Sequence, residues 1–151
     1  MNERQTILLV DDSEDDLILL RAAFKRAEFL RSFQQVRNGE EAIAYLEGGG
    51  IYRDRSKFPL PSLVLLDLNM PRKNGFEVLD WIRTESGLKH LPIVILTASM
   101  RPEDVKRAFE LGANSFLVKP GALEELTRMI RCLRDWLQYN HLPPLNEMVR
   151  R

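Results

Sequence analysis

The feature that most constrains this chain is a regular alternation of short apolar runs with amphipathic patterns. Runs typical of buried strands are TILLV at 6–10, SLVLL at 62–66, IVIL at 93–96 and SFLV at 115–118, and SFQQVR at 32–37 is a weaker fifth. Between these runs lie segments in which apolar residues recur at helical spacing, at 17–27, 42–46, 76–82 and 105–112. Because parallel strands need crossover connections, the order predicts an α/β fold: a five-stranded parallel sheet with helices on both faces, doubly wound and flavodoxin-like.

The last helical pattern is longer than the others. Apolar residues recur every three or four positions from Leu123 to Leu137, and Asn140 with the Pro143-Pro144 pair ends the helix. We therefore expect one domain at 1–140 and a tail at 141–151 that is too short for an output domain. The segment EGGGIYRDRSKFPLP at 47–61 exceeds ordinary loops of such folds, so it is either a mobile insertion or a contact surface.

Charge and composition narrow the classes of function. Lys plus Arg and Asp plus Glu number 22 each, so no global field attracts this chain to nucleic acid or to an acidic membrane. The start MNERQT lacks an apolar signal region and no apolar run could span a bilayer, which predicts a cytoplasmic protein. The single cysteine, Cys132, has no disulfide partner, and we expect it to serve packing.

Polar residues stand where the predicted strands end. Asp11 and Asp12 follow the first strand, Asp67 the third, Thr97 the fourth and Lys119 the fifth. The carboxyl ends of parallel strands share one edge, where open α/β sheets bind ligands. Three clustered carboxylates favour a divalent cation, Mg²⁺ above all, while the lysine supplies a cation and the threonine a hydroxyl for a phosphoryl group. The pattern indicates phosphoryl transfer with Asp67 as nucleophile.

Each of these residues also has an ordinary structural explanation. The Asp11-Asp12 pair could begin a helix whose N-terminus favours acids, and Asp67 could begin a turn. Thr97 could cap the next helix, and a lone Lys119 is commonly a solvated charge. These explanations account poorly for four strand ends that together carry the groups of phosphoryl chemistry.

The sequence resembles the receiver domains of two-component response regulators over about residues 5 to 138. The segments that carry the resemblance are LLVDDSEDD, LLDLNMPRKNG, ILTAS and GANSFLVKP, in family order and spacing. The resemblance implies that Asp67 accepts a phosphoryl group from a histidine kinase. It also implies that Asp12, Asp67 and the backbone carbonyl of Asn69 hold Mg²⁺, with Asp11 assisting through water.

The resemblance further implies a conformational switch. Thr97 follows the phosphoryl group, Phe116 swings inward behind it, and Lys119 binds it, while a cis peptide bond precedes Pro120. The family more often has Tyr at the position of Phe116. Such a protein is a phosphoacceptor switch that assists its own phosphoryl transfer and dephosphorylation, and not an enzyme acting on a separate substrate.

A narrower resemblance lies in IYRDRSKFPLPSLVLLDL and WLQYNHLPPL, which look like the single-domain response regulators paired with phytochromes. It implies a sensor histidine kinase, with a phytochrome as one candidate, or a phosphotransfer protein as partner. It also implies a homodimer through the fourth helix, fifth strand and fifth helix. Met129, Trp136 and Tyr139 fall outside the apolar stripe and would face water in a monomer unless the tail covers them.

Three other classes of protein share parts of this pattern. A phosphatase of the haloacid dehalogenase type would use the same kind of nucleophile and metal. The second acid of its motif transfers protons, but Asn69 occupies that position here. A flavodoxin-like electron carrier needs phosphate-binding donors after the first strand, where DDSEDD would repel an anion. A purely structural adaptor is the third alternative.

Overall fold

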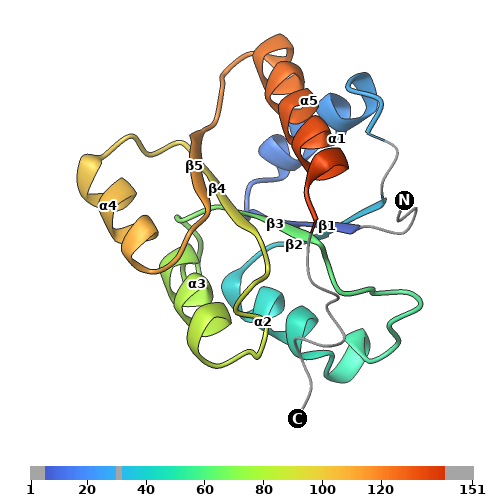
Figure 1. Ribbon diagram of the computed structural model, residues 1–151, viewed down its shortest axis with the longest axis vertical. Helices are drawn as coiled ribbons and strands as arrows, with labels where there is room; N and C mark the ends of the chain where they lie inside the picture. The colour runs from blue at the N-terminus through green and yellow to red at the C-terminus, as the bar shows by residue number, and fades with distance from the viewer. Residues whose placement is uncertain (1–5, 30–31, 142–151) are drawn as a thin grey trace.

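The computed structural model describes residues 6–29 and 32–141, which form one parallel sheet between two layers of helices (Figure 1). The strand order is β2-β1-β3-β4-β5. The strands are β1 Thr6–Val10, β2 Ser32–Val36, β3 Leu63–Leu66, β4 Ile93–Thr97 and β5 Ser115–Val118. This order reverses direction at β1, as doubly wound sheets do, so the predicted α/β fold is confirmed.

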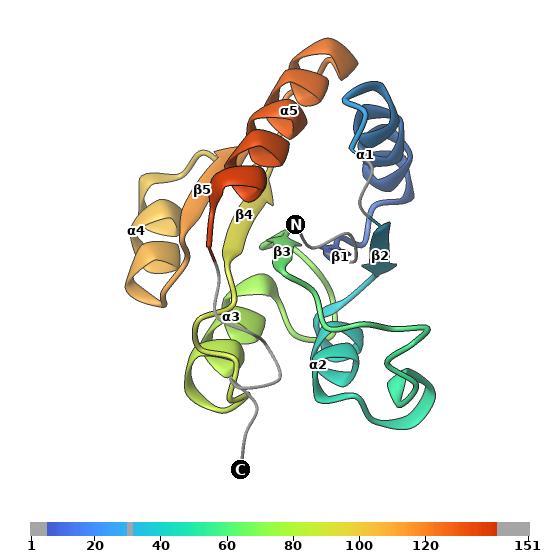
Figure 2. The ribbon, with the colours of Figure 1, turned by 45° about the vertical axis from the view of Figure 1, so that its right-hand side comes forward.

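Among the described residues, four α-helices connect the strands and a fifth follows β5, and together they cover the sheet. They are α1 Glu14–Arg26, α2 Gly39–Glu47, α3 Gly75–Thr84, α4 Pro102–Glu110 and α5 Leu123–Tyr139. The helices α1 and α5 lie side by side on one face, α2 and α3 lie on the other, and α4 flanks β5 (Figure 2). In the described part of the chain no helix is both long and apolar enough to cross a membrane.

Burial on both faces explains the unbroken apolar runs of the strands. In β1, Leu8 and Val10 belong to the cluster under α2 and α3, while Ile7 and Leu9 belong to the cluster under α1 and α5. All five β1 residues are buried, whereas the edge strand β5 has no fully buried residue. A strand that is covered on both faces does not alternate between apolar and polar residues. It is recognised in the sequence as a short, unbroken apolar run.

The segment at 47–61 is fixed by contacts to α2. The guanidinium of Arg55 donates hydrogen bonds to the carbonyl oxygens of Tyr45 at 2.8 Å, Leu46 at 2.9 Å and Phe58 at 3.1 Å. The rings of Tyr45, Tyr52 and Phe58 pack together with centroids 5.0 to 6.0 Å apart. These contacts anchor the segment to α2, which argues against a mobile insertion, and its role as a contact surface stays a prediction.

Two expectations for α5 are wrong. Cys132 is exposed and does not serve packing. Met129 is partly buried against the cluster under α1 and α5 and is not left facing water, so the buried side of α5 is wider than the stripe from Leu123 to Leu137. Trp136 and Tyr139 are exposed as expected, with 42% and 78% of their surface accessible. Residues 142–151, most of the predicted tail, lie outside the described residues.

Candidate functional site

The sheet itself positions the predicted site residues. The ladder of backbone hydrogen bonds continues one residue beyond three strands: the Asp11 amide bonds to β2 at 3.1 Å, the Asp67 amide to β1 at 2.9 Å and the Lys119 amide to Thr97 at 2.8 Å. Backbone groups held in this way aim their side chains at a common point above the sheet edge. The structure thus brings together the residues that the sequence places at strand ends.

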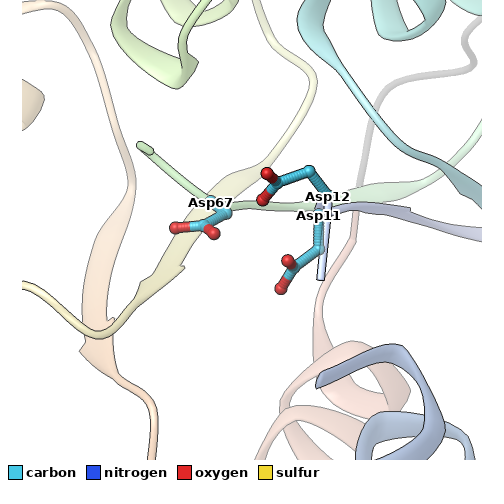
Figure 3. A group of neighbouring side chains, drawn as sticks. All are labelled: Asp11, Asp12 and Asp67. Carbon is cyan, nitrogen blue, oxygen red and sulfur yellow. The ribbon is translucent and has the colours of Figure 1, made fainter. Parts of the chain in front are cut away.

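Three carboxylates meet at this edge (Figure 3). One carboxylate oxygen from each of Asp11, Asp12 and Asp67 lies within 4.8 Å of the others, and we call these residues the acidic cluster. Asp11 and Asp67 are buried, with 3% and 7% of their surface exposed, while Asp12 is open to solvent. Oxygen ligands in such a group suit a hard divalent cation with one side left for water or a phosphoryl group.

Lys119 is the cation that faces the acidic cluster. Its ammonium lies 2.7 Å from Asp11 Oδ2 and 3.2 Å from Asp67 Oδ2, and a third carboxylate, Asp16 Oδ2, lies at 2.6 Å. Burial lowers the pKa of Lys119, but hydrogen bonds to Asp11 and Asp16 and the charge of Asp67 outweigh burial and raise the pKa above its ordinary value. The side chain is therefore charged at neutral pH.

Burial also acts on Asp11. It raises the pKa of this carboxyl above its usual range, although Lys119 and the Ser13 amide, which both bond to it, lower the pKa. The Ser13 amide donates to Asp11 Oδ1 at 2.9 Å, so the side chain has a fixed orientation. A bound cation would offset the same desolvation cost that raises this pKa.

Thr97 ends β4 beside Lys119. It is fully buried, and its hydroxyl has no hydrogen-bond partner among the residues that the structure describes. A buried hydroxyl without a partner costs free energy, which a ligand oxygen could offset. Phe116 is half-buried and packs against the cluster under α2 and α3. The roles of both residues in a switch stay predictions.

The loop from β3 to α3 turns back on itself beside Asp67. Arg72 and Lys73 adopt positive φ angles of 49° and 73°, and the Gly75 amide donates to the Leu68 carbonyl at 3.0 Å. A Cβ on Gly75 would lie 2.3 Å from the Asp67 carbonyl oxygen. Gly75 thus permits the close return of the chain beside Asp67.

Asn69 lies in this loop and is exposed, and its amide is 3.4 Å from Asp67 Oδ1. The carbonyl that the resemblance assigns to the metal stays a prediction. An open recess of about 740 Å³ lies next to the acidic cluster, lined in part by Asp12, Asn69, Arg101 and Arg107. A small phosphodonor or a partner side chain could approach Asp67 from this side.

Two details of the site differ from the sequence-based expectations. The peptide bond before Pro120 is trans, so the expected cis bond is wrong; trans is the lower-energy form of X-Pro bonds. Asp16, which contacts Lys119, was missed because an acidic residue in the first turn of a helix is adequately explained by the helix dipole. Asp11 precedes α1, so its spacing of five residues from Asp16 follows no helical period and gives no signal of the contact.

Comparison with known proteins identifies close relatives. The family model for the response regulator receiver domain matches residues 7–131. The chain is 37% identical over 143 residues to "Response regulator Rcp1" of Synechocystis sp., covering 94% of this chain and 95% of that protein. It is 39% identical over 141 residues to "Probable methanogenesis regulatory protein FilR2" of Methanothrix harundinacea, covering 91% and 86%.

Solved structures give the same result. The phosphorylated cyanobacterial phytochrome response regulator RcpA has a TM-score of 0.85 and 32% identity, covering 93% of this chain and 99% of that chain. The response regulator RPA3017 in red light signalling of R. palustris has a TM-score of 0.87 and 32% identity over the same shares. A Mn²⁺-bound form of Rcp1 has a TM-score of 0.81 and 37% identity, again with 93% and 99% covered.

Proposed function

Since the chain belongs to the response regulator receiver domain family, we propose that Asp67 is its phosphoacceptor. The observation that supports this assignment is the position of Asp67, which is buried at the end of β3 between Lys119 and the other two carboxylates of the acidic cluster. The carboxylate oxygen forms a bond to phosphorus while the bond from phosphorus to the donor's leaving group breaks, and the leaving group keeps the electron pair.

The acidic cluster fits a divalent cation, which we propose to be Mg²⁺. Asp12 and Asp67 would hold it together with the Asn69 carbonyl, and Asp11 would act through water. The cation, when bound, neutralises the charge that gathers on the phosphoryl oxygens. The relative Rcp1 has a Mn²⁺-bound form, which supports a divalent metal in this chain as well. Mg²⁺ is the hard cation that best combines carboxylates, waters and a phosphate.

Lys119 and Thr97 would recognise the phosphoryl group itself. The ammonium is already 3.2 Å from Asp67 Oδ2, so a short movement would bring it to an oxygen of the new group. The Thr97 hydroxyl, which has no partner among the described residues, could donate a second hydrogen bond. Movement of Thr97 would leave space behind it for Phe116, which lies half-buried on β5 next to β4. Both shifts change the surface near α4 and β5.

This surface is the proposed signalling output and dimer interface. Large apolar side chains are exposed on each element that flanks it: Phe109 on α4, Val118 on β5, and Trp136 and Tyr139 on α5. Exposed apolar residues that cluster usually mark contacts with another chain. We propose a homodimer through α4, β5 and α5, with α5 contributing Trp136 and Tyr139 as anchors.

Light scattering of matched variants tests the dimer. The variant Trp136→Ala/Tyr139→Ala should be monomeric at tens of micromolar, whereas truncation after Asn140 should leave the dimer intact. Ile51→Ala is the control, because Ile51 is 75% exposed but lies on the segment at 47–61, away from α5. A monomeric wild-type protein, with and without a phosphoryl mimic, would refute the dimer and favour a tail that covers Trp136 within one chain.

The relatives also suggest the partner and context. RcpA is a phytochrome response regulator and RPA3017 acts in red light signalling, so we propose a sensor histidine kinase, with a phytochrome-type kinase as the first candidate. A phosphotransfer protein is the other donor to test. We propose a receiver domain at 1–140 and a tail at 141–151 in a cytoplasmic protein that signals by protein contacts. The family match gives no support to the phosphatase of the haloacid dehalogenase type.

Intact mass measured after incubation with acetyl phosphate and Mg²⁺ tests the function. A receiver gains one phosphoryl group per chain and holds it, a phosphatase turns over the donor without retaining it, and an adaptor does neither. Asp67→Asn should keep the fold and take up nothing. Uptake by that variant at the wild-type rate would show that the nucleophile is another residue.

A further inference from the structure

We propose that Asp16 is a positioning residue that holds the Lys119 ammonium toward α1 and thereby slows phosphoryl transfer to Asp67. The inference rests on the proposed function of Asp67. Two distances support the inference: Lys119 Nζ lies 2.6 Å from Asp16 Oδ2 but 3.2 Å from Asp67 Oδ2. The shorter contact is thus to a carboxylate outside the acidic cluster, on a different element.

The backbone of Asp16 is held at the start of α1. The Ser13 hydroxyl caps the helix by accepting a hydrogen bond from the Asp16 amide at 3.2 Å. The Ser13 amide in turn donates to Asp11 Oδ1 at 2.9 Å. The loop after β1 therefore sets the separation between Asp16 and the acidic cluster, and Lys119 spans the two. Within 4 Å of the Asp16 carboxylate, Lys119 is the sole cationic group among the described residues.

Competition for the ammonium follows from this arrangement. Lys119 contacts three carboxylates, and its side chain is only 13% exposed, so water screens these contacts less than it would at an open surface. A phosphoryl group on Asp67 adds about 1.5 to 2 negative charges that need the same ammonium. Asp16 retains part of the attraction of Lys119, so less of that attraction acts on the incoming group. It forms no bond to phosphorus, so its effect acts through Lys119.

Helix stability alone does not account for Asp16. Acids in the first turn of α1 include Glu14 and Asp15 as well, and these two are exposed and make no contact to Lys119. The side chain of Asp16 is 35% exposed, and pairs at that exposure add little stability. Its distinguishing property is the contact to a residue 103 positions away in the sequence.

The test compares Asp16→Asn with Asp15→Asn, which removes the same charge from the neighbouring position of the same helical turn. The rate of phosphorylation by acetyl phosphate with saturating Mg²⁺ is measured for both and for the wild type by intact mass. Asp16→Asn should react about three to ten times faster than the wild type, as expected for release of one partly exposed ion pair. Asp15→Asn should react at the wild-type rate.

A double-mutant cycle shows whether the effect passes through Lys119. In a Lys119→Met background, Asp16→Asn should no longer accelerate the reaction, because the ammonium that it releases is absent. Acceleration that persists there would overturn the inference, as would a variant Asp16→Asn that equals Asp15→Asn or reacts more slowly than the wild type. A wild-type protein that takes up no phosphoryl group would instead refute the proposed function.

Discussion

Replacing Gly75 with alanine should distort the phosphoacceptor strand. A Cβ at this position would lie 2.3 Å from the Asp67 carbonyl oxygen and 2.8 Å from the Leu68 Cα, both backbone atoms. Ordinary contact begins at 3.4 Å, so the chain would have to separate by about 1 Å. The end of β3 cannot easily move, because the Asp67 amide is bonded to β1.

Two opposing energies decide the sign of the effect. Alanine gains at most about 1 kcal/mol over glycine from helix propensity, and less at the first position of α3. Overpacking against rigid atoms costs roughly 1 to 3 kcal/mol and more where backbone must move. We expect Gly75→Ala to lose about 2 kcal/mol of unfolding free energy, which lowers Tm by roughly 4 to 8 °C for a chain of this size. Displacement of Asp67 by about 1 Å should slow phosphorylation about a hundredfold.

Gly121→Ala is the matched control. Gly121 lies beyond Lys119 at the same edge of the sheet, and a Cβ there meets nothing within 4 Å. Thermal unfolding and the initial rate of phosphorylation by acetyl phosphate are measured for both variants. The reasoning is refuted if Gly75→Ala matches Gly121→Ala in both measurements.

Three further predictions concern the metal, the phosphoryl lifetime and pH. Mg²⁺ at about 100 times its Kd should stabilise the protein by roughly 2.7 kcal/mol, and Asp12→Ala should abolish that response; a Tm indifferent to millimolar Mg²⁺ would contradict the site. Ser99→Ala should change the dephosphorylation rate only modestly, since Ser99 is no general base and its hydroxyl is 2.6 Å from Asp104 Oδ2; a hundredfold change would show a direct chemical part. Burial raises the pKa of Tyr45 to about 12, so unfolded chains release its proton first and stability should fall as pH rises from about 10 to 12. Tyr45→Phe should reduce that fall in the urea midpoint, leaving the part that comes from Lys119 and Tyr52, whose pKa values are also raised, and an unchanged pH profile would contradict the assignment.

The sequence predicts the fold well because the apolar runs of the strands and the helical patterns between them indicate the same architecture. Strands covered on both faces are continuous apolar runs, and the helical patterns between them leave the crossover topology as the consistent solution. The site followed from the same reasoning, since strand ends in a parallel sheet converge. Asp11, Asp67 and Lys119 needed no contact information beyond that geometry, and the structure brings their side chains within hydrogen-bond distance.

The parts that sequence reasoning missed depend on side-chain contacts between distant segments. Asp16 meets Lys119 across 103 positions, and its own neighbourhood explains it as a helix-dipole residue. Met129 packs against a cluster built from several elements, which the spacing on α5 alone does not determine. Arg55 fixes the segment at 47–61 through backbone carbonyl oxygens, and such acceptors carry no residue-specific signal.

Chemical mapping of the phosphorylated residue tests the central claim most directly. The protein is incubated with acetyl phosphate and Mg²⁺, reduced with borohydride, which converts an aspartyl phosphate to homoserine, and digested for peptide mass spectrometry. The account predicts homoserine at position 67 and at no other acidic position. Homoserine at Asp11 or Asp12, or no conversion in a protein that has gained a phosphoryl group, would contradict it.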